Sequence, residues 1–207
     1  MESVKKHKKS IAVAFGIIAV LVICYLIGQN IVLPQRMKSA GYTDADGKIP
    51  VYSILEQFNT FAIGGEKAAD VPGSKSITQI EFNKDNSGIP DEWLGSCIFM
   101  LPNTSFAKQM KIENRCTKID LEYGIYPDIT KDVCDGANLV VEVYIDENKD
   151  PVIHEEFNAQ AGEDLKRASV DISKYAGNNV TITFSCNDGG KNNEDGDWMM
   201  IKYPVIE

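Results

Sequence analysis

The stretch VDISKYAGNNVTITFSCNDGGKNNEDGDWMMIKYPVI, residues 170–206, decides the fold of this chain. It begins with an Asp-Ile-Ser-Lys-Tyr-Ala-Gly turn and continues as an alternating segment and a long loop of Asn, Gly and Asp. It ends with an apolar segment that opens at Asp197-Trp198. Turn residues that separate short β-prone segments are typical of antiparallel β-domains.

The alternating segment, residues 180–186, has the side-chain period of a strand. One face carries the apolar side chains Val180, Ile182, Phe184 and Cys186, and the other carries Thr181, Thr183 and Ser185. Because successive side chains of a strand point to opposite faces, the pattern predicts a strand with one face in a core and the other in water.

Similar segments fill the chain from Ile77 onward. Each is of strand length, and clusters of Gly, Asn, Asp or Pro separate them. The nine predicted strands cover residues 77–83, 95–101, 105–112, 117–126, 138–145, 151–157, 167–172, 179–186 and 197–206. Antiparallel sheets with one apolar face must stack to hide that face, so the sequence predicts an all-β domain, an antiparallel jelly-roll β-sandwich.

Two segments precede these strands. Residues 38–50, KSAGYTDADGKIP, are rich in Gly, Asp and Pro, which indicates an exposed connection. In VYSILEQFNTF, residues 51–61, apolar side chains recur at helical spacing. This spacing predicts a short amphipathic helix that covers one end of a sheet, with an irregular strand as the alternative.

An apolar run without a charge lies near the N-terminus. Residues 11–28, IAVAFGIIAVLVICYLIG, would form about 27 Å of helix, close to the hydrocarbon thickness of a bilayer. The run follows four lysines, Lys5, Lys6, Lys8 and Lys9, so the positive-inside rule places the N-terminus in the cytoplasm. A cleaved secretory signal is the alternative, but no small-x-small cleavage site follows the run.

These features divide the chain into four predicted parts. They are a cytoplasmic basic stub (1–10), a single-pass transmembrane anchor in the cell membrane (11–33), a linker (34–50) and an extracellular jelly-roll domain (51–207). The formal net charge is -9, to which residues 1–10 contribute +3 and the pair Arg36 and Lys38 contributes +2. The remainder is therefore strongly acidic, which argues against nucleic acid as a partner.

Four of the five cysteines, Cys97, Cys116, Cys134 and Cys186, follow the apolar run. An even number of cysteines in an oxidising compartment permits two disulfides with three possible connectivities. Cys186 lies on the apolar face of its predicted strand, so a small core residue with a free thiol is the alternative.

Five segments carry a family resemblance, namely CIFMLPNTSFAKQMKI, IDLEYGIYPD, DGANLVVEVYID, VDISKYAG and DGGKNNEDGDW. In this order they resemble NPCBM-type carbohydrate-binding modules and related jelly-roll lectin domains of bacterial glycoside hydrolases and membrane glycosyltransferases. The resemblance covers residues 96–206 and implies a sugar-binding sandwich. Many such modules carry Asp-His-Ala-Asp-Trp where this chain has Glu194-Asp195-Gly196-Asp197-Trp198. Asp195 thus replaces a histidine, and sugar recognition is altered or lost if that histidine holds the sugar.

The loop of residues 187–197 offers oxygen ligands for a cation. Calcium takes roughly six to eight oxygens, and glycines allow a loop to fold around the ion. The resemblance also implies a structural calcium ion, and the predicted ligands are Asp188, Glu194, Asp195 and Asp197. A connection without an ion is the alternative, because Asn, Asp and Gly tolerate left-handed turns.

Sugar recognition needs an aromatic face for the apolar side of the ring and planar polar groups for its hydroxyls. The predicted sugar-binding residues are Trp93, Tyr126, Asn192, Asn193 and Asp195. For Trp93 the alternative is a side chain that closes one end of the sandwich, and Trp198 is expected in the core.

No catalytic residue is predicted. His154 is the only histidine after the apolar run, and we expect it to face water from a strand. The sequence therefore predicts a membrane-anchored, extracellular, non-catalytic module that binds cell-surface or cell-wall glycan and a structural calcium ion. The alternative is a sandwich without sugar affinity that docks as a protein subunit in a surface or envelope complex, which the replaced histidine favours.

Overall fold

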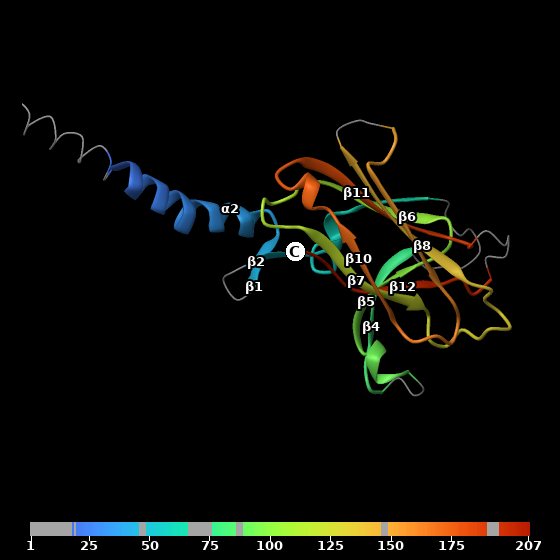
Figure 1. Cartoon of the computed structure of the whole chain (residues 1–207). Coiled ribbons are helices and arrows are strands. Elements are labelled where there is room, and N and C mark those ends of the chain that lie inside the picture. Colours follow the sequence, from blue (N-terminus) through green and yellow to red (C-terminus); the bar gives the residue numbers. More distant parts are fainter. Residues whose placement is uncertain are drawn as a thin grey trace, which may run out of the picture. The chain divides into compact units, whose positions relative to one another are not determined.

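The computed structural model describes residues 18, 20–45, 49–65, 76–85, 89–145, 149–189 and 195–207. Among these residues the chain separates into two compact units, Met1–Thr43 and Asp44–Glu207. The predicted basic stub, residues 1–10, lies outside the described residues, as does part of the predicted anchor. Figure 1 shows the helical first unit and the β-rich second unit.

The first unit is helical where it is described. Residues 20–27 are α-helical, a π-helical turn η1 spans Gly28–Val32, and α2 spans Leu33–Ser39. Apolar side chains of residues 20–32 are exposed on this helix. No helix within the described part of the chain is long and apolar enough to cross a membrane. The helix ends at Gly41, whose φ of 92° is a left-handed conformation that glycine adopts without strain.

The second unit is a sandwich of two antiparallel sheets. The longer strands of sheet A are β4 (Ile77–Phe82), β5 (Gly95–Met100), β12 (Met199–Ile206), β7 (Lys118–Ile125) and β10 (Lys166–Asp171). The short strands β1 (Tyr42–Ala45) and β2 (Ile49–Ser53) extend this sheet, and β2 pairs with the end of β12. Sheet B has the order β3 (Ala62–Gly65), β6 (Thr104–Lys111), β11 (Asn179–Asn187), β8 (Ala137–Ile145) and β9 (Ile153–Ala159). The predicted β-sandwich is confirmed.

All nine predicted strands are present, as β4 to β12. The alternation along β11 is confirmed, because Val180, Ile182, Phe184 and Cys186 are buried and the residues between them are partly exposed. The short strands β1 and β3 were not predicted, β2 corresponds in part to the irregular strand given as the alternative for residues 51–61, and β1 and most of α2 lie in the segment expected to be a linker, residues 34–50. Pairing with neighbouring strands, which the local sequence does not reveal, makes such short segments extended.

The helix predicted for residues 51–61 is wrong. Val51 to Ser53 belong to β2, a turn follows, and only Phe58–Thr60 form a 3-10 turn, η2. Of the apolar residues at helical spacing, Ile54, Phe58 and Phe61 are nevertheless buried, and the rings of Phe58 and Phe61 each contact Phe106 edge-on at 5.5 Å. The apolar pattern therefore indicated which face of this segment is buried. The pairing of β2 with β12 decided the backbone conformation of residues 51–53.

The core lies between the two sheets, and a second apolar cluster lies on the opposite side of sheet A. In the core, Phe106 of β6 stacks on Phe184 of β11 with ring centroids 4.8 Å apart. The second cluster consists of Phe82, Trp93, Cys97 and Met200. Trp93 ends the 3-10 turn η3 (Asp91–Trp93) and covers part of the face of sheet A that points away from sheet B.

All five cysteines are free thiols in the structure, and Cys97, Cys116, Cys134 and Cys186 are buried. Burial raises the pKa of Cys97 and Cys116 to about 11 and that of Cys186 to about 12. Thiols with such pKa values stay protonated at neutral pH and behave as small apolar side chains. The structure therefore agrees with the alternative of free thiols in the core and not with two disulfides.

Candidate functional site

The two predicted aromatic sugar-binding residues lie in packed surroundings. Trp93 is only 1% exposed, and a Cβ added at Gly124 would meet its ring at 2.9 Å. A ring buried to this extent belongs to the interior of the protein, and it covers the outward face of sheet A rather than one end of the sandwich. Tyr126 is half-buried, with its ring 5.6 Å from that of Phe82 and 5.9 Å from that of Trp198.

The predicted residues of the acidic loop divide into three groups. Asn192, Asn193 and Glu194 lie outside the described residues. Asp195 is exposed and Asp188 is partly buried. Asp197 is 0% exposed. The structure therefore brings Asp197 inside the protein and leaves Asp195 at the surface.

Asp197 connects three loops at one end of the sandwich. Its Oδ1 accepts a hydrogen bond of 3.0 Å from the thiol of Cys134, and its carbonyl oxygen lies 3.9 Å from the thiol of Cys186. The backbone of Gly136 also donates to its carboxylate. Gly189 lies against the same segment, since a Cβ there would approach the carbonyl oxygen of Gly136 to 2.7 Å.

The carboxyl group of Asp197 is an unusual buried acid. Burial raises its pKa, the hydrogen bond from Cys134 acts in the opposite direction, and the charges of Asp135 and Asp188 raise it further. Its Oδ2 is buried and has no hydrogen-bond partner among the residues that the structure describes. A buried carboxylate oxygen in this situation suits a proton or a cation.

We tested the predicted calcium ligands against this geometry. Within the described residues no group of three or more His, Cys, Asp or Glu side chains could hold a metal ion. Oδ2 of Asp197 is buried and suits a cation, whereas Asp195 is exposed. The described part of the loop thus provides one oriented carboxylate oxygen.

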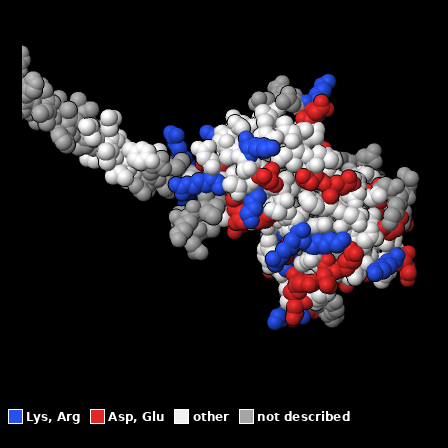
Figure 2. All heavy atoms as spheres, in the orientation of Figure 1, with Lys and Arg blue, Asp and Glu red and all other residues white. Residues whose placement is uncertain are grey.

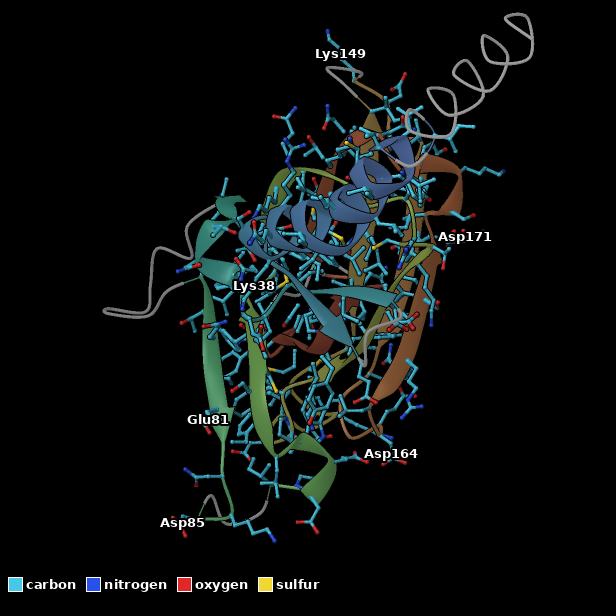
Figure 3. The ribbon with its side chains drawn as sticks, turned by 90° about the vertical axis from the view of Figure 1, so that its left-hand side faces the viewer. Lys38, Glu81, Asp85, Lys149, Asp164 and Asp171 are labelled. Atoms are coloured by element: carbon cyan, nitrogen blue, oxygen red, sulfur yellow. The ribbon has the colours of Figure 1, made fainter. Side chains whose placement is uncertain are left out.

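A hollow of about 420 Å³ lies on the outward face of sheet A. Its wall consists of Lys118, Asp120, Leu121, Glu122, Arg167, Ala168, Ser169 and Tyr203. Figure 2 shows acidic and basic side chains interspersed on the side of the molecule that carries β7 and β10 in Figure 1. Figure 3 shows Asp164 and Asp171 near the two ends of β10, the strand that forms one wall.

The register of two strands places the polar side chains of this hollow. Lys118, Asp120 and Glu122 are alternate residues of β7, so they share its outward face. Arg167 lies opposite Glu122 and Ser169 lies opposite Asp120 on β10. Directly opposed residues of antiparallel strands are close enough to interact, and Nε of Arg167 lies 3.1 Å from Oε1 of Glu122.

The polar groups in the hollow form a charged network. The ammonium group of Lys118 binds Asp120 and lies 2.9 Å from Oε1 of Glu207, and these hydrogen bonds raise the pKa of Lys118 to about 12. Burial alone would raise the pKa of Asp120, but hydrogen bonds from Lys118 and Ser169 outweigh it and lower that pKa. Both groups are therefore charged at neutral pH.

Tyr203 adds an aromatic ring to the hollow. β12 changes register between Lys202 and Val205, and Tyr203 occupies this bulge with a φ of 49°. The ring is 55% exposed, and Nζ of Lys202 lies 4.8 Å from its centroid. Lys202 is itself buried and donates to the carbonyl oxygen of Glu92. Bulges of this kind redirect a side chain, here outward and beside the polar groups.

The sequence contained only part of this site. The alternation in residues 118–125 already indicated an outward polar face on β7. Tyr203 lies in a segment that reads as a plain apolar strand, and nothing local marks the bulge. Arg167 and Ser169 became site residues only when β10 paired with β7.

Comparison with known proteins gives matches at the level of solved structures. No family model and no curated protein matches the chain. The carbohydrate-binding module TmCBM61, solved with β-1,4-galactotriose, is 13% identical, with a TM-score of 0.47 over 74% of this chain and 97% of that one.

Two further modules are similar. The CBM51 of Clostridium perfringens GH95, solved with methyl-galactose, is 16% identical, with a TM-score of 0.42 over 70% of this chain and 88% of that one. The carbohydrate-binding module CBM36, solved with calcium and xylotriose, is 13% identical, with a TM-score of 0.36 over 71% of this chain and 92% of that one. These three solved structures are carbohydrate-binding modules.

Proposed function

We propose that this chain is a non-catalytic carbohydrate-binding module of the NPCBM-like type, and that the hollow on sheet A binds a sugar. The observation that carries the proposal is the exposed ring of Tyr203 beside Asp120, Glu122, Arg167 and Ser169. A sugar ring has an apolar face and a rim of hydroxyls. The aromatic ring suits the former, and fixed carboxylates, a guanidinium and a hydroxyl suit the latter.

The ion pairs in the hollow support this proposal, because they order carboxylate side chains before a ligand binds. The carboxylates of Asp120 and Glu122 are 30% and 22% exposed and are paired with Lys118 and Arg167, so few of their rotamers remain to be fixed when a ligand binds, whereas Arg167 itself is 84% exposed. Each flexible side chain that a ligand immobilises costs about 0.5–1.5 kcal/mol. A hollow with preordered polar groups therefore binds a small hydroxylated ligand at a lower entropic cost.

The test is glycan binding by the full chain in a polyoxyethylene detergent, which has no sugar headgroup. β-1,4-Galactotriose, xylotriose and isolated cell-wall polysaccharide serve as probes. We expect at least one probe to be retained, and we expect Tyr203→Ala to reduce its affinity at least tenfold. Tyr175→Ala, which changes a partly buried tyrosine of the 3-10 turn η4 (Ser173–Tyr175) outside the hollow, is the matched control. Absence of binding to every probe would refute the proposal and favour the protein-docking alternative.

We also propose that the first unit anchors the chain in the cell membrane with its N-terminus in the cytoplasm. The apolar side chains of residues 20–32 are exposed in a helix, and the apolar run begins at residue 11. Such a helix is stable in lipid, where its backbone groups remain paired within the helix. Retention in membranes after alkaline carbonate extraction is expected, and release into the supernatant would contradict the anchor.

The structural calcium ion remains a proposal that Asp197 supports. A cation beside Oδ2 would compensate the buried charge of this carboxylate. We expect calcium to raise the melting temperature of the full chain at neutral pH, because an ion that binds only the folded state stabilises it. Asp197→Asn should remove this response. An equal response in the variant would show that the ion binds elsewhere.

A further inference from the structure

The outward face of sheet B is a second polar surface, separate from the hollow on sheet A. The registers of β6, β11, β8 and β9 arrange its side chains in four rows across the sheet. The rows are Gln109–Thr181–Tyr144, Ala107–Thr183–Glu142–His154, Ser105–Ser185–Val140–Glu156 and Asn187–Asn138–Asn158. We name these residues the sheet B face.

The composition of the sheet B face is unusual for an exposed strand surface. Hydroxyl and amide side chains dominate it, its carboxylates are Glu142 and Glu156, and the next pair along the same face of β6 and β11 is Lys111 with Asn179. The middle strand β11 contributes Thr181, Thr183 and Ser185, all partly exposed. Because the hydroxyl side chains are short, they project little from the sheet, and a ligand can contact several strands at once.

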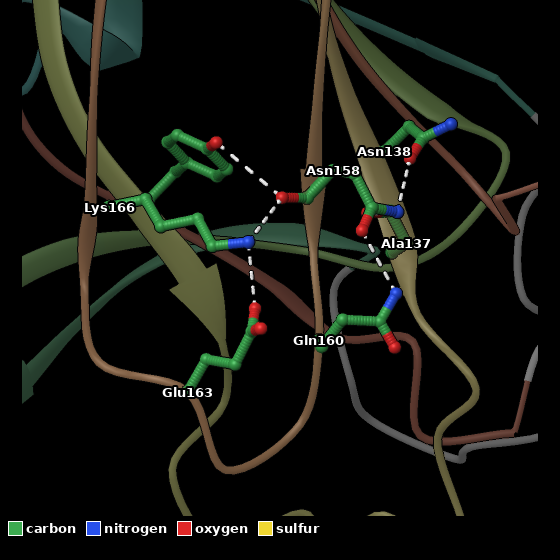
Figure 4. A network of polar contacts seen from close by, with 7 residues as sticks. Ala137, Asn138, Asn158, Gln160, Glu163 and Lys166 are labelled. Carbon is green, nitrogen blue, oxygen red and sulfur yellow. Dashed lines mark hydrogen bonds and ion pairs between the residues drawn. The ribbon is translucent and has the colours of Figure 1, made fainter.

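Hydrogen bonds order the amides at one end of this face (Figure 4). Nε2 of Gln160 donates to Oδ1 of Asn158 at 2.9 Å, and Nδ2 of Asn158 donates to Oδ1 of Asn138 at 2.8 Å. Asn138 in turn donates to Glu156. Lys166 holds the backbone of this edge, with Nζ 3.0 Å from the carbonyl oxygen of Asn158.

Glu142 orders the middle of the face. Its Oε2 accepts a hydrogen bond of 2.8 Å from the hydroxyl of Tyr144, and its Oε1 lies 2.9 Å from Nδ1 of His154. The charge of this carboxylate is thus shared between two partners. The face thus presents ordered donors and acceptors on two strands, β8 and β9, before any ligand binds.

These properties select one class of occupant. Anionic polymers are disfavoured, because the face carries the two carboxylates Glu142 and Glu156 against the single lysine Lys111 at its end. Protein partners usually bind through buried aromatic or Arg anchors, and Tyr144 is already bonded to Glu142. A neutral polyhydroxyl chain needs what the face supplies, which is many amides and hydroxyls along a surface about 20 Å long at roughly 3.3 Å per residue.

We propose that the sheet B face is a second glycan-binding site, which takes an extended neutral oligosaccharide. This inference rests on the proposed function, since it assumes a carbohydrate-binding module. Because the two outward faces of a sandwich point in opposite directions, one chain then binds two separate glycan strands and links them. Two weak sites on one molecule also raise its avidity for a polysaccharide surface.

The test counts the sites on the full chain by isothermal titration with xylotriose and with β-1,4-galactotriose, in a polyoxyethylene detergent. We expect two binding events per chain. Tyr203→Ala should remove the event at the hollow, and Thr183→Lys, which places a long side chain in the centre of the sheet B face, should remove the other. Thr78→Lys, the same change on a strand outside both surfaces, is the control and should keep both events.

The outcomes separate the two proposals. A single event that Tyr203→Ala abolishes and Thr183→Lys leaves intact would overturn the second site and retain the hollow. A single event that only Thr183→Lys abolishes would support the sheet B face and refute the hollow. The double variant Asn138→Ala with Asn158→Ala checks the result without a bulky substitution, and it should weaken the same event at least fivefold. No binding by the unaltered chain would overturn both proposals.

Discussion

At the scale of single residues, Asp197 shows how one position serves several elements. Its side chain accepts from the thiol of Cys134 and its carbonyl lies beside Cys186, so it joins the segment before β8 to the end of β11 and the start of β12. The position holds a buried acid, and no donor within the described part of the chain reaches its Oδ2. The sequence identified Asp197 as a candidate ligand, and the structure makes it the buried member of that group.

Asp197→Asn is expected to stabilise the chain in the absence of calcium. Because burial raises the folded-state pKa of Asp197 above 3.8, the folded state holds this proton more tightly than the unfolded chain. The free energy of unfolding therefore falls as pH rises from 3.8 through the raised pKa and stays reduced above it. With calcium chelated, urea denaturation at pH 7 should show a gain of about 1–2 kcal/mol for the variant. At pH 3 the difference should be small, and an equal gain at both pH values would contradict this account.

Gly124→Ala is expected to destabilise the chain. A Cβ at this position would meet the buried ring of Trp93 at 2.9 Å, and the ring is packed against Cys97 and Met200. Overpacking of this kind costs about 1–3 kcal/mol, measurable as a lower urea midpoint. Gly64→Ala on the edge strand β3 is the control, because its nearest contact is the Oγ of Ser105 at 3.2 Å. A larger loss of stability for Gly64→Ala than for Gly124→Ala would show that the contact with Trp93 does not cause the destabilisation.

At the scale of elements, the bulge in β12 places the aromatic ring of the hollow. β12 pairs with β7 on one side and with β5 and β2 on the other, and its register changes between Lys202 and Val205. The change turns Tyr203 away from the core with a φ of 49°. This strand is therefore both the central connection of sheet A and the element that presents the ring.

Tyr203→Gly separates the backbone role of this bulge from the role of the ring. A non-glycine residue in the left-handed region costs about 1–3 kcal/mol, and glycine avoids this cost while losing about 0.5–1 kcal/mol through greater freedom in the unfolded chain. Thermal denaturation should therefore show unchanged or slightly higher stability. Glycan retention should fall as in Tyr203→Ala. A variant that binds glycan normally would remove the ring from the proposed site.

At the scale of the whole molecule, the core between the sheets supports both outward faces. Phe106 contacts Phe184 and the rings of Phe58 and Phe61, so it holds the segment before β3 against sheet B. The outward faces of both sheets then carry polar side chains from the same strands that bury apolar ones. The strand period of two thus gives one domain a single core and two surfaces.

Phe106→Ala should lower the free energy of unfolding by about 3–5 kcal/mol, because it removes a fully buried ring and leaves a cavity. Urea denaturation measures this loss. Ile63→Ala on β3 is the control, since Ile63 is 53% exposed, and its effect should remain within about 0.5 kcal/mol. Equal losses for the two variants would contradict the assignment of the core.

The sequence by itself determined the β-sandwich and its nine longer strands, because the alternation of apolar and polar side chains is a local property that burial enforces. It also indicated that Trp198 and Cys186 lie in packed surroundings. The short strands β1 to β3, the conformation of residues 51–61 and the burial of Trp93 depended on pairing and packing with distant segments. Only the tertiary structure joined Tyr203 to Asp120, Glu122 and Arg167, because strand register and a bulge place them side by side, and neither is a property of neighbouring residues in sequence.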